Sequence, residues 1–279
     1  MTAHTSNVRY PSLDRVLPVT RVLAIIIIPF LFVAWLVLYL FPDSSGEHFA
    51  WPVRPHMTAM MLGAAYLGGV YYFARVARAS QWHTVALGLP AVTSFATYLG
   101  IATVLHWDRF TPGHIAFILW AILYLGLPPI LVGVWYWNRT VARAGAPVPK
   151  PDLSNSVRFA FGSIGVVLSV VSIVLMLSPA TLIPSWPWTL TPLTARVMSA
   201  LFVLPGVVGI GIARDGRWSS ARILLQAQVG SLVLIVIAAI LSNSDFDWSS
   251  VGAWLMVGSF VGLTAMLTIL IFRFDRRRA

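Results

Sequence analysis

Cysteine is absent from this sequence, and charged residues are scarce. None of the 279 residues is cysteine, and Asp, Glu, Lys and Arg together make up 10% of the chain. Without cysteine the protein can form no disulfide framework, no thiolate metal site and no cysteine nucleophile. Soluble domains are about 25% charged, so the low charge content excludes a soluble enzyme, a free nucleic-acid binder and a disordered chain.

Long apolar stretches take the place of charged surface. Hydrophobic residues account for 58% of the chain, and the mean hydropathy is +0.81. A helix that crosses the ~30 Å hydrocarbon layer needs about 20 mostly apolar residues, and the sequence contains eight such stretches. They lie approximately at 20–41, 57–75, 84–105, 115–137, 157–178, 193–213, 222–241 and 249–272. The sequence therefore predicts an all-α fold, a polytopic transmembrane helical bundle.

The basic residues predict how these spans are oriented. Eighteen of the 19 basic residues are arginine, which suggests a protein from a high-GC bacterial genome. Lys and Arg concentrate in short cytoplasmic loops. A cytoplasmic N-terminus puts sixteen of the 19 on that side and leaves only Arg54, Arg109 and Arg196 outside. We therefore expect a multi-pass protein of the bacterial cytoplasmic (plasma) membrane with both termini cytoplasmic, whose net charge of +10 attracts anionic membrane lipids and not nucleic acid.

The second half of the chain repeats features of the first at an offset of about 136 residues. Segment 51–59, Trp-Pro-Val-Arg-Pro-His-Met-Thr-Ala, is matched by 186–195, Trp-Pro-Trp-Thr-Leu-Thr-Pro-Leu-Thr-Ala. This predicts two tandem four-helix repeats: residues 1–150, with the cytoplasmic N-terminus and a linker, and residues 151–279, with a basic cytoplasmic C-terminus. An even number of spans puts both repeats the same way up, in parallel orientation about an axis along the membrane normal.

Polar residues inside the spans are few, and each has both a ligand-binding and a structural interpretation. No Asp, Glu or Lys lies near mid-membrane, which argues against a proton-coupled transporter or pump. The candidate ligand-binding residues are Thr58 and Thr194, at matching places in the two repeats, with Arg196, Gln226 and Gln228. As structural residues, the threonines align a helix entry, the arginine reaches the outer headgroups and the glutamines bond across helices.

Four of the six histidines gather on the predicted outer side: His48, His56, His106 and His114. Imidazole is a common metal ligand, so these residues are the candidates for a haem or divalent metal site. Their spacing matches no metal-binding motif, and solvated loop histidines are the alternative. No catalytic residue is assigned and no cofactor is predicted, because phosphate-binding, dinucleotide-binding, zinc-protease, nucleophile-elbow and prenyl-transferase motifs are all absent from the sequence.

Two further polar sites have simpler interpretations. Asp245 and Asp247 lie in the last outer loop, where we expect them to hydrogen-bond the start of the final span and to favour its positive end. Asn138, with Arg139 and Thr140, fits a glycosylation sequon. The sequon falls on the predicted cytoplasmic side and is therefore discounted.

The two Trp-Pro…Pro…Thr-Ala segments resemble those of uncharacterised multi-pass membrane proteins of high-GC bacteria over most of the chain, which implies an architecture but no activity. The architecture also resembles haem A synthase, which has two four-helix halves and paired histidines at the outer ends of the second and fourth helices of each half. His56 and His114 are similar to the first pair in placement, which implies a haem at the outer surface. The chain departs from that family in its second half, which has no histidine, and in lacking a Glu-x-x-x-His-Arg element.

These features favour a non-enzymatic membrane protein, a binding or assembly subunit whose two bundles hold a lipid or a partner at their mutual seam. That partner is either another protein or a second copy of the chain. One alternative is a transporter or channel for a small or amphiphilic solute, since many transport folds contain parallel repeats. The other is a haem- or metal-binding membrane enzyme that acts at the outer surface through His56 and His114.

Overall fold

The computed structural model describes residues 14–143 and 150–276, and every regular element within these ranges is helical. Eight helices are long and apolar enough to cross a membrane. They are α1 with its continuation (Pro18–Leu40), α3 (His56–Arg78), α4 (Gly88–Leu105), α5 with α6 (Ile115–Ala142), α7 (Asn155–Leu177), α8 (Pro192–Asp215), α9 (Trp218–Leu241) and α10 (Val251–Arg276). The predicted all-helical fold with eight candidate spans is confirmed.

Two of the spans are interrupted by π-helical turns. α1 itself covers Pro18–Trp35 and continues into Leu36–Leu40, and Ile122–Gly126 joins α5 (Ile115–Ala121) to α6 (Leu127–Arg143). The short elements are α2 (Ser45–His48) and 3₁₀ turns at Pro42–Ser44, Trp82–Thr84, Trp107–Arg109, Pro179–Thr181, Ile183–Ser185 and Asn243–Asp245. The predicted boundaries differ from the observed ones by a few residues. The third span, for example, begins only at Gly88, because a 3₁₀ turn precedes it.

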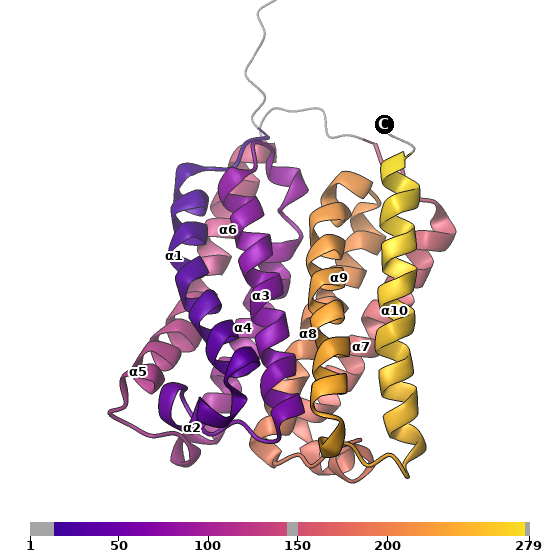
Figure 1. Cartoon of the computed structure of the whole chain (residues 1–279). Helices are drawn as coiled ribbons and strands as arrows, with labels where there is room; N and C mark the ends of the chain where they lie inside the picture. Colours follow the sequence, from indigo (N-terminus) through magenta and orange to yellow (C-terminus); the bar gives the residue numbers. More distant parts are fainter. Residues whose placement is uncertain (1–13, 144–149, 277–279) are drawn as a thin grey trace, which may run out of the picture.

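Of the eight spans in the described chain, four are more deeply buried and form the centre of the bundle, and four lie at its periphery. Figure 1 shows their arrangement. In α3, 61% of the apolar window is buried, against 11% in α10. Each peripheral helix packs on one central neighbour: α1 on α3, α6 on α4, α7 on α8 and α10 on α9. Two further contacts, α4 with α8 and α3 with α9, join the halves. The core therefore lies among α3, α4, α8 and α9, and the outer helices expose apolar side chains suited to lipid.

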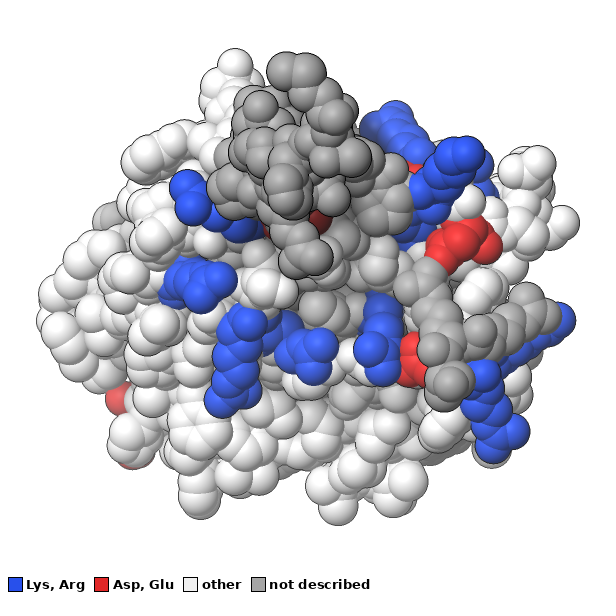
Figure 2. Space-filling model, turned by 90° about the horizontal axis from the view of Figure 1, so that it is seen from above, with Lys and Arg blue, Asp and Glu red and all other residues white. Residues whose placement is uncertain are grey.

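The two ends of the bundle differ in composition. The upper end in Figure 1, which we call the basic end, carries arginines near helix ends, among them Arg75, Arg78, Arg214, Arg222 and Arg273. Figure 2 looks down on this end and shows many blue side chains but few red ones. The opposite end, which we call the Trp-Pro end, carries Trp51 with Pro52 and Trp186 with Pro187. Both α3 and α8 run from the Trp-Pro end to the basic end.

Asn138 of α6 fastens the outer helices of the first half together. Its side chain is fully buried, and Oδ1 accepts hydrogen bonds from Leu17 N at 2.9 Å and from Thr20 Oγ1 at 2.7 Å. Nδ2 donates to the carbonyl oxygen of Arg15 at 2.9 Å. Leu17 directly precedes α1, where backbone N–H groups have no partner within the helix. Asn138 therefore caps α1 from another helix and holds α1 against α6.

Glycines bring α7 and α8 into backbone contact in the second half. A Cβ atom at Gly165 would lie 2.7 Å from Ile210 N and 2.8 Å from the carbonyl oxygen of Gly206. One at Gly209 would lie 2.6 Å from the carbonyl oxygen of Phe161. Small residues at helix interfaces permit such an approach in membranes. The α7–α8 pair is thus held together by direct backbone packing at these glycines.

Candidate functional site

An apolar crevice runs between the helices of the second half and the centre of the bundle. Its volume is about 200 Å³, and α3, α4, α7, α8, α9 and α10 line it. Among the described residues of this lining, only Tyr72, Gln228 and Ser231 carry polar side chains. The hydroxyl of Tyr72 donates to Val85 O at 2.8 Å, and that of Ser231 donates to Ala64 O at 3.1 Å. Both hydroxyls are therefore satisfied within the protein.

Gln228 is the polar group that the crevice leaves available. Its side chain lines the crevice and makes no hydrogen bond with any residue that the structure describes. Gln226, two positions earlier on α9, instead accepts a hydrogen bond from Tyr71 Oη at 2.7 Å. The two glutamines predicted as ligand-binding residues thus have different environments. Only Gln228 offers amide donors and an acceptor to the crevice.

The crevice is open on one side because α7 and α10 do not pack together. α7 packs on α8 and α10 packs on α9, and within the described chain α7 and α10 share no comparable contact. In the first half, by contrast, the outer helices α1 and α6 are in contact, and Asn138 joins them. At the basic end the first half is thus closed between its peripheral helices, whereas α7 and α10 have no comparable contact within the described residues.

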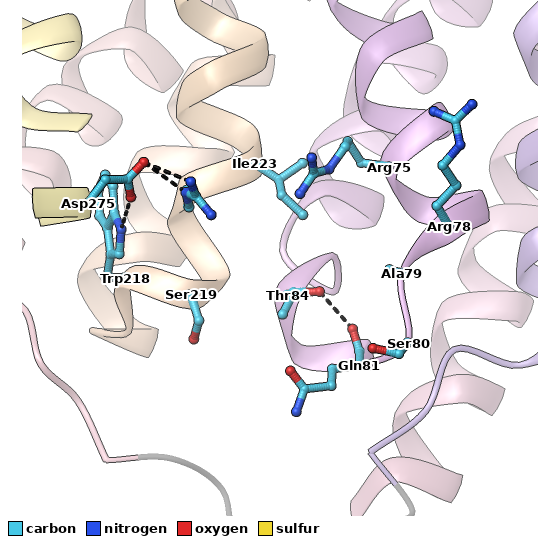
Figure 3. A pocket seen from close by; sticks show the side chains of 11 residues that line it. Arg75, Arg78, Ala79, Ser80, Gln81, Thr84, Trp218, Ser219, Ile223 and Asp275 are labelled. Carbon is cyan, nitrogen blue, oxygen red and sulfur yellow. Dashed lines mark hydrogen bonds and ion pairs between the residues drawn. The ribbon is translucent and has the colours of Figure 1, made fainter. Parts of the chain in front are cut away.

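A second cavity, the basic pocket, lies at the basic end (Figure 3). Its volume is about 620 Å³, and it is formed by the end of α3, the turn that follows, the start of α9 and the end of α10. Among the described residues, the charged side chains in its lining are Arg75, Arg78, Arg222 and Asp275. These three arginines and one aspartate give the described part of the lining two net positive charges.

The aspartate of the basic pocket is fully engaged by α9. Asp275 Oδ2 accepts from Arg222 Nε at 3.1 Å and from Arg222 Nη2 at 2.8 Å, while Oδ1 accepts from Trp218 Nε1 at 3.1 Å. Arg75 and Arg78 are exposed and have no ion-pair partner among the described residues. The arrangement therefore fixes one guanidinium in place and leaves two others free to meet an anion.

The two matched threonines at the Trp-Pro end make different hydrogen bonds. Thr58 Oγ1, near the start of α3, accepts from Trp188 Nε1 at 2.9 Å, so a side chain of the second half contacts the first. Thr194 forms a capping box with Thr191 at the start of α8, with N–H to Oγ1 distances of 3.2 and 2.7 Å. Both predicted ligand-binding threonines thus take part in internal hydrogen bonds at helix entries.

Arg196, another predicted ligand-binding residue, bridges two helix ends. Its Nε donates to Met176 O at 3.0 Å, and its Nη1 donates to His106 Nε2 at 2.7 Å. Met176 lies at the end of α7 and His106 directly follows α4. Arg196 therefore joins α8 to α4 and α7. The sequence had suggested instead that its guanidinium reaches the outer headgroups.

The contact with Arg196 makes His106 sensitive to pH. Burial of the ring and the neighbouring charge of Arg196 lower the pKa of His106. Because the unfolded chain then binds this proton more readily, the contribution of neutral His106 to stability is complete above its ordinary pKa of about 6.5. That contribution is lost as the pH falls through the lowered pKa.

We expect the unfolding temperature of the detergent-solubilised protein to fall between pH 7 and pH 5 and to fall less in His106→Gln, which does not titrate. A glutamine keeps an acceptor for Arg196, so the comparison isolates the proton. An identical pH dependence in the two proteins would show that His106 carries none of the effect.

The other three histidines that the sequence predicts on the outer side each have a separate environment. His56 Nε2 lies 2.7 Å from Asp43 Oδ1, and His48 Nδ1 lies 3.3 Å from Ser44 O. His114 Nδ1 accepts from the N–H of Ala116 at 3.3 Å and caps α5. Within the described residues no group of three or more His, Cys, Asp or Glu side chains could hold a metal ion. A haem or metal site at these histidines stays a prediction.

The expectation that Asp245 hydrogen-bonds the start of the final span is wrong. Its Oδ2 accepts from Met57 N at 2.7 Å and thereby caps α3, not the final span. The residue before α3 is Pro55, which has no side-chain acceptor of its own. Asp247 lies four positions before α10, and its Oδ1 accepts from Ser249 N at 3.1 Å. The first turn of the final span is capped instead by Ser250, whose Oγ accepts from Gly252 N at 3.1 Å. A loop of the second half thus supplies the cap that α3 lacks.

The basic pocket and the crevice were not recognised as sites from the sequence. In the sequence, Arg75, Arg78 and Arg222 indicate only orientation, and the apolar lining residues are indistinguishable from other span residues. Comparison of the chain with known protein families, with curated proteins and with solved structures finds no match.

Proposed function

We propose that this protein is a non-enzymatic, lipid-binding membrane protein that holds the hydrocarbon part of an amphiphile in the apolar crevice. The observation that carries the proposal is the separation of α7 from α10, which leaves an apolar cavity of about 200 Å³ open at the side of the bundle. Apolar cavities stay dry and bind apolar guests. A cavity that opens toward the bilayer is therefore filled by hydrocarbon.

The length and chemistry of the crevice suit a hydrocarbon chain. Its lining on α3 extends from Met61 to Tyr72, which corresponds to about 16 Å along a helix axis. That is roughly half of a ~30 Å hydrocarbon layer. The described lining contains no charged side chain, so an ion or a strongly hydrated solute would lose its water there without compensation. Gln228 supplies one polar contact for a carbonyl or hydroxyl group of the amphiphile.

We also propose that the chain consists of two tandem four-helix repeats in parallel orientation, residues 1–150 and 151–279. The contacts support this arrangement, because α1 with α3 corresponds to α7 with α8, and α4 with α6 corresponds to α9 with α10. The contacts between halves, α3 with α9 and α4 with α8, are the pair that a two-fold axis along the membrane normal would relate. The crevice then lies where the second repeat lacks the closure that Asn138 gives the first.

The distribution of arginine supports a cytoplasmic location for the basic end. Short loops rich in Lys and Arg stay in the cytoplasm, and the predominance of arginine over lysine supports a bacterial origin. We therefore place the protein in a bacterial cytoplasmic membrane. The crevice lining is centred near mid-span on α3, α9 and α10 and reaches the basic end of α4 at Gly88, so the part nearest the basic end lies in the cytoplasmic leaflet.

Filling the crevice with a larger side chain tests the proposal. Leu263 of α10 lines the crevice. We expect Leu263→Trp to weaken lipid binding by at least about tenfold, because excluding two CH₂ groups costs about 1.6 kcal/mol. Native mass spectrometry of the protein purified in mild detergent, followed by analysis of the released lipid, measures the retained amount.

The matched control for this test is Ile269→Trp. Ile269 lies on the same helix but is 66% exposed and outside the crevice. It should retain as much lipid as the wild-type protein. Equal retention by the two tryptophan variants, or no retained lipid in the wild-type protein, would contradict the proposed function.

A further inference from the structure

We propose that the basic pocket binds the phosphate of the same lipid whose hydrocarbon chain occupies the crevice, so that the ligand is an anionic phospholipid. This inference rests on the proposed function and specifies the class of lipid. The two cavities together would then form one amphiphile site, apolar inside the bilayer and positive at the basic end.

The two cavities adjoin along α3 and α9. On α3, Tyr72 lines the crevice and Arg75, one helical turn further on, lines the basic pocket. On α9, Leu224 belongs to the crevice lining, and the preceding residue, Ile223, belongs to the pocket. A molecule bound in the crevice with its chain directed toward mid-membrane therefore has its polar end beside the arginines.

The charged groups of the pocket are placed for a phosphate. Figure 3 shows the Arg75 side chain directed toward Ile223 of α9, across the pocket from Asp275. The ion pair with Asp275 uses Nε and Nη2 of Arg222 and holds that guanidinium at the pocket. Arg75 has no competing carboxylate among the described residues. Guanidinium groups bind phosphate through paired N–H donors.

The start of α9 adds to the positive potential. This 24-residue helix begins at Trp218, which lines the pocket, and a helix N-terminus carries a partial positive charge. Basic pockets between spans on the cytoplasmic side are suited to anionic headgroups. The partial charge of the helix end adds to the charge of the two arginines, which are the basis of the site.

The test compares two lipids with the same chains and different headgroup charge. The detergent-purified full chain is titrated with phosphatidylglycerol and with phosphatidylcholine, and binding is followed by native mass spectrometry. We expect phosphatidylglycerol to bind about thirtyfold more tightly, the ratio that corresponds to about 1 kcal/mol for each of two positive charges near the headgroup. Glycerol phosphate, which carries the phosphate without a chain, should not compete at concentrations that exceed those of the lipid.

The double variant Arg75→Gln with Arg222→Gln should bind phosphatidylglycerol no better than phosphatidylcholine and leave phosphatidylcholine binding unchanged. Arg75→Lys with Arg222→Lys keeps the charge and should restore most of the preference. The control, Arg139→Gln, removes one charge on α6, outside the pocket, and should keep the full preference. Unchanged phosphatidylcholine binding in the double variant also shows that it is folded.

Four outcomes would overturn this inference. Equal binding of the two lipids by the wild-type protein would leave the crevice proposal standing and remove the headgroup site. An equal loss of preference in Arg139→Gln would show that diffuse surface charge is responsible. Competition by glycerol phosphate would show a site for free phosphate that does not depend on the crevice. Failure of both lipids to bind would overturn the proposed function itself.

Discussion

Replacing Asn138 with leucine should destabilise the protein by about 3 kcal/mol or more. Leucine has nearly the same size but leaves the N–H of Leu17, the hydroxyl of Thr20 and the carbonyl of Arg15 without their partner. Each unsatisfied buried polar group costs about 1–3 kcal/mol. Asn138 itself is fully buried, so water cannot readily take its place. Unfolding of the detergent-solubilised protein, followed by circular dichroism, measures the loss.

Thr140→Ala is the control for this prediction. Thr140 is an exposed residue of the same helix, and its hydroxyl donates only to the carbonyl of Trp137. Its replacement should change stability by no more than about 0.5 kcal/mol. If Asn138→Leu is no more damaging than Thr140→Ala, then Asn138 does not hold α1 against α6. Asn138 would then not explain why α1 and α6 are in contact whereas α7 and α10 are apart.

Gly165→Leu should separate α7 from α8 and cost about 3 kcal/mol. Overpacking a filled interface costs about 1–3 kcal/mol, and here the atoms in the way are backbone, 2.7 and 2.8 Å from the added Cβ. Backbone cannot move aside as a flexible side chain can. The smaller change Gly165→Ala already introduces this Cβ and should be destabilising as well. The unfolding temperature and the yield of monodisperse protein are the measurements.

Gly262→Leu provides the comparison on α10. A Cβ atom at Gly262 would meet no other atom within 4 Å, so the variant should be as stable as the wild-type protein or slightly more stable, because leucine favours helix. Equal stability of the leucine variants at 165 and 262 would contradict the close α7–α8 contact. The difference between them therefore reports the glycine interface and not helix propensity.

The helical architecture followed from composition, because a run of about 20 apolar residues has few stable alternatives to a membrane span. Which helices pack against each other could not be predicted from composition. α4 packs on α8 and α3 on α9, and these choices depend on glycine contacts and side-chain shapes that apolar runs do not reveal. Asn138 is an example. In the sequence it is part of a glycosylation sequon, but a single amide near the end of a span is also a signal of an interhelical hydrogen bond.

The candidate site was predictable only in part. Two glutamines on one helix are equivalent in sequence, yet Gln228 lines the crevice while Gln226 bonds to Tyr71. Arg75 and Arg222 are far apart in the chain, so their meeting at one pocket required the fold. Asp245 was expected at the nearest helix in sequence but caps α3. In each case the deciding factor was the direction of a side chain.

An experimental structure of the protein in a nanodisc that contains phosphatidylglycerol tests the lipid site most directly. We expect α7 and α10 to remain apart and the crevice between Leu263 and Gln228 to contain elongated density continuous with a headgroup near Arg75 and Arg222. Direct packing of α7 on α10, with side chains filling the crevice and no lipid density, would contradict this expectation.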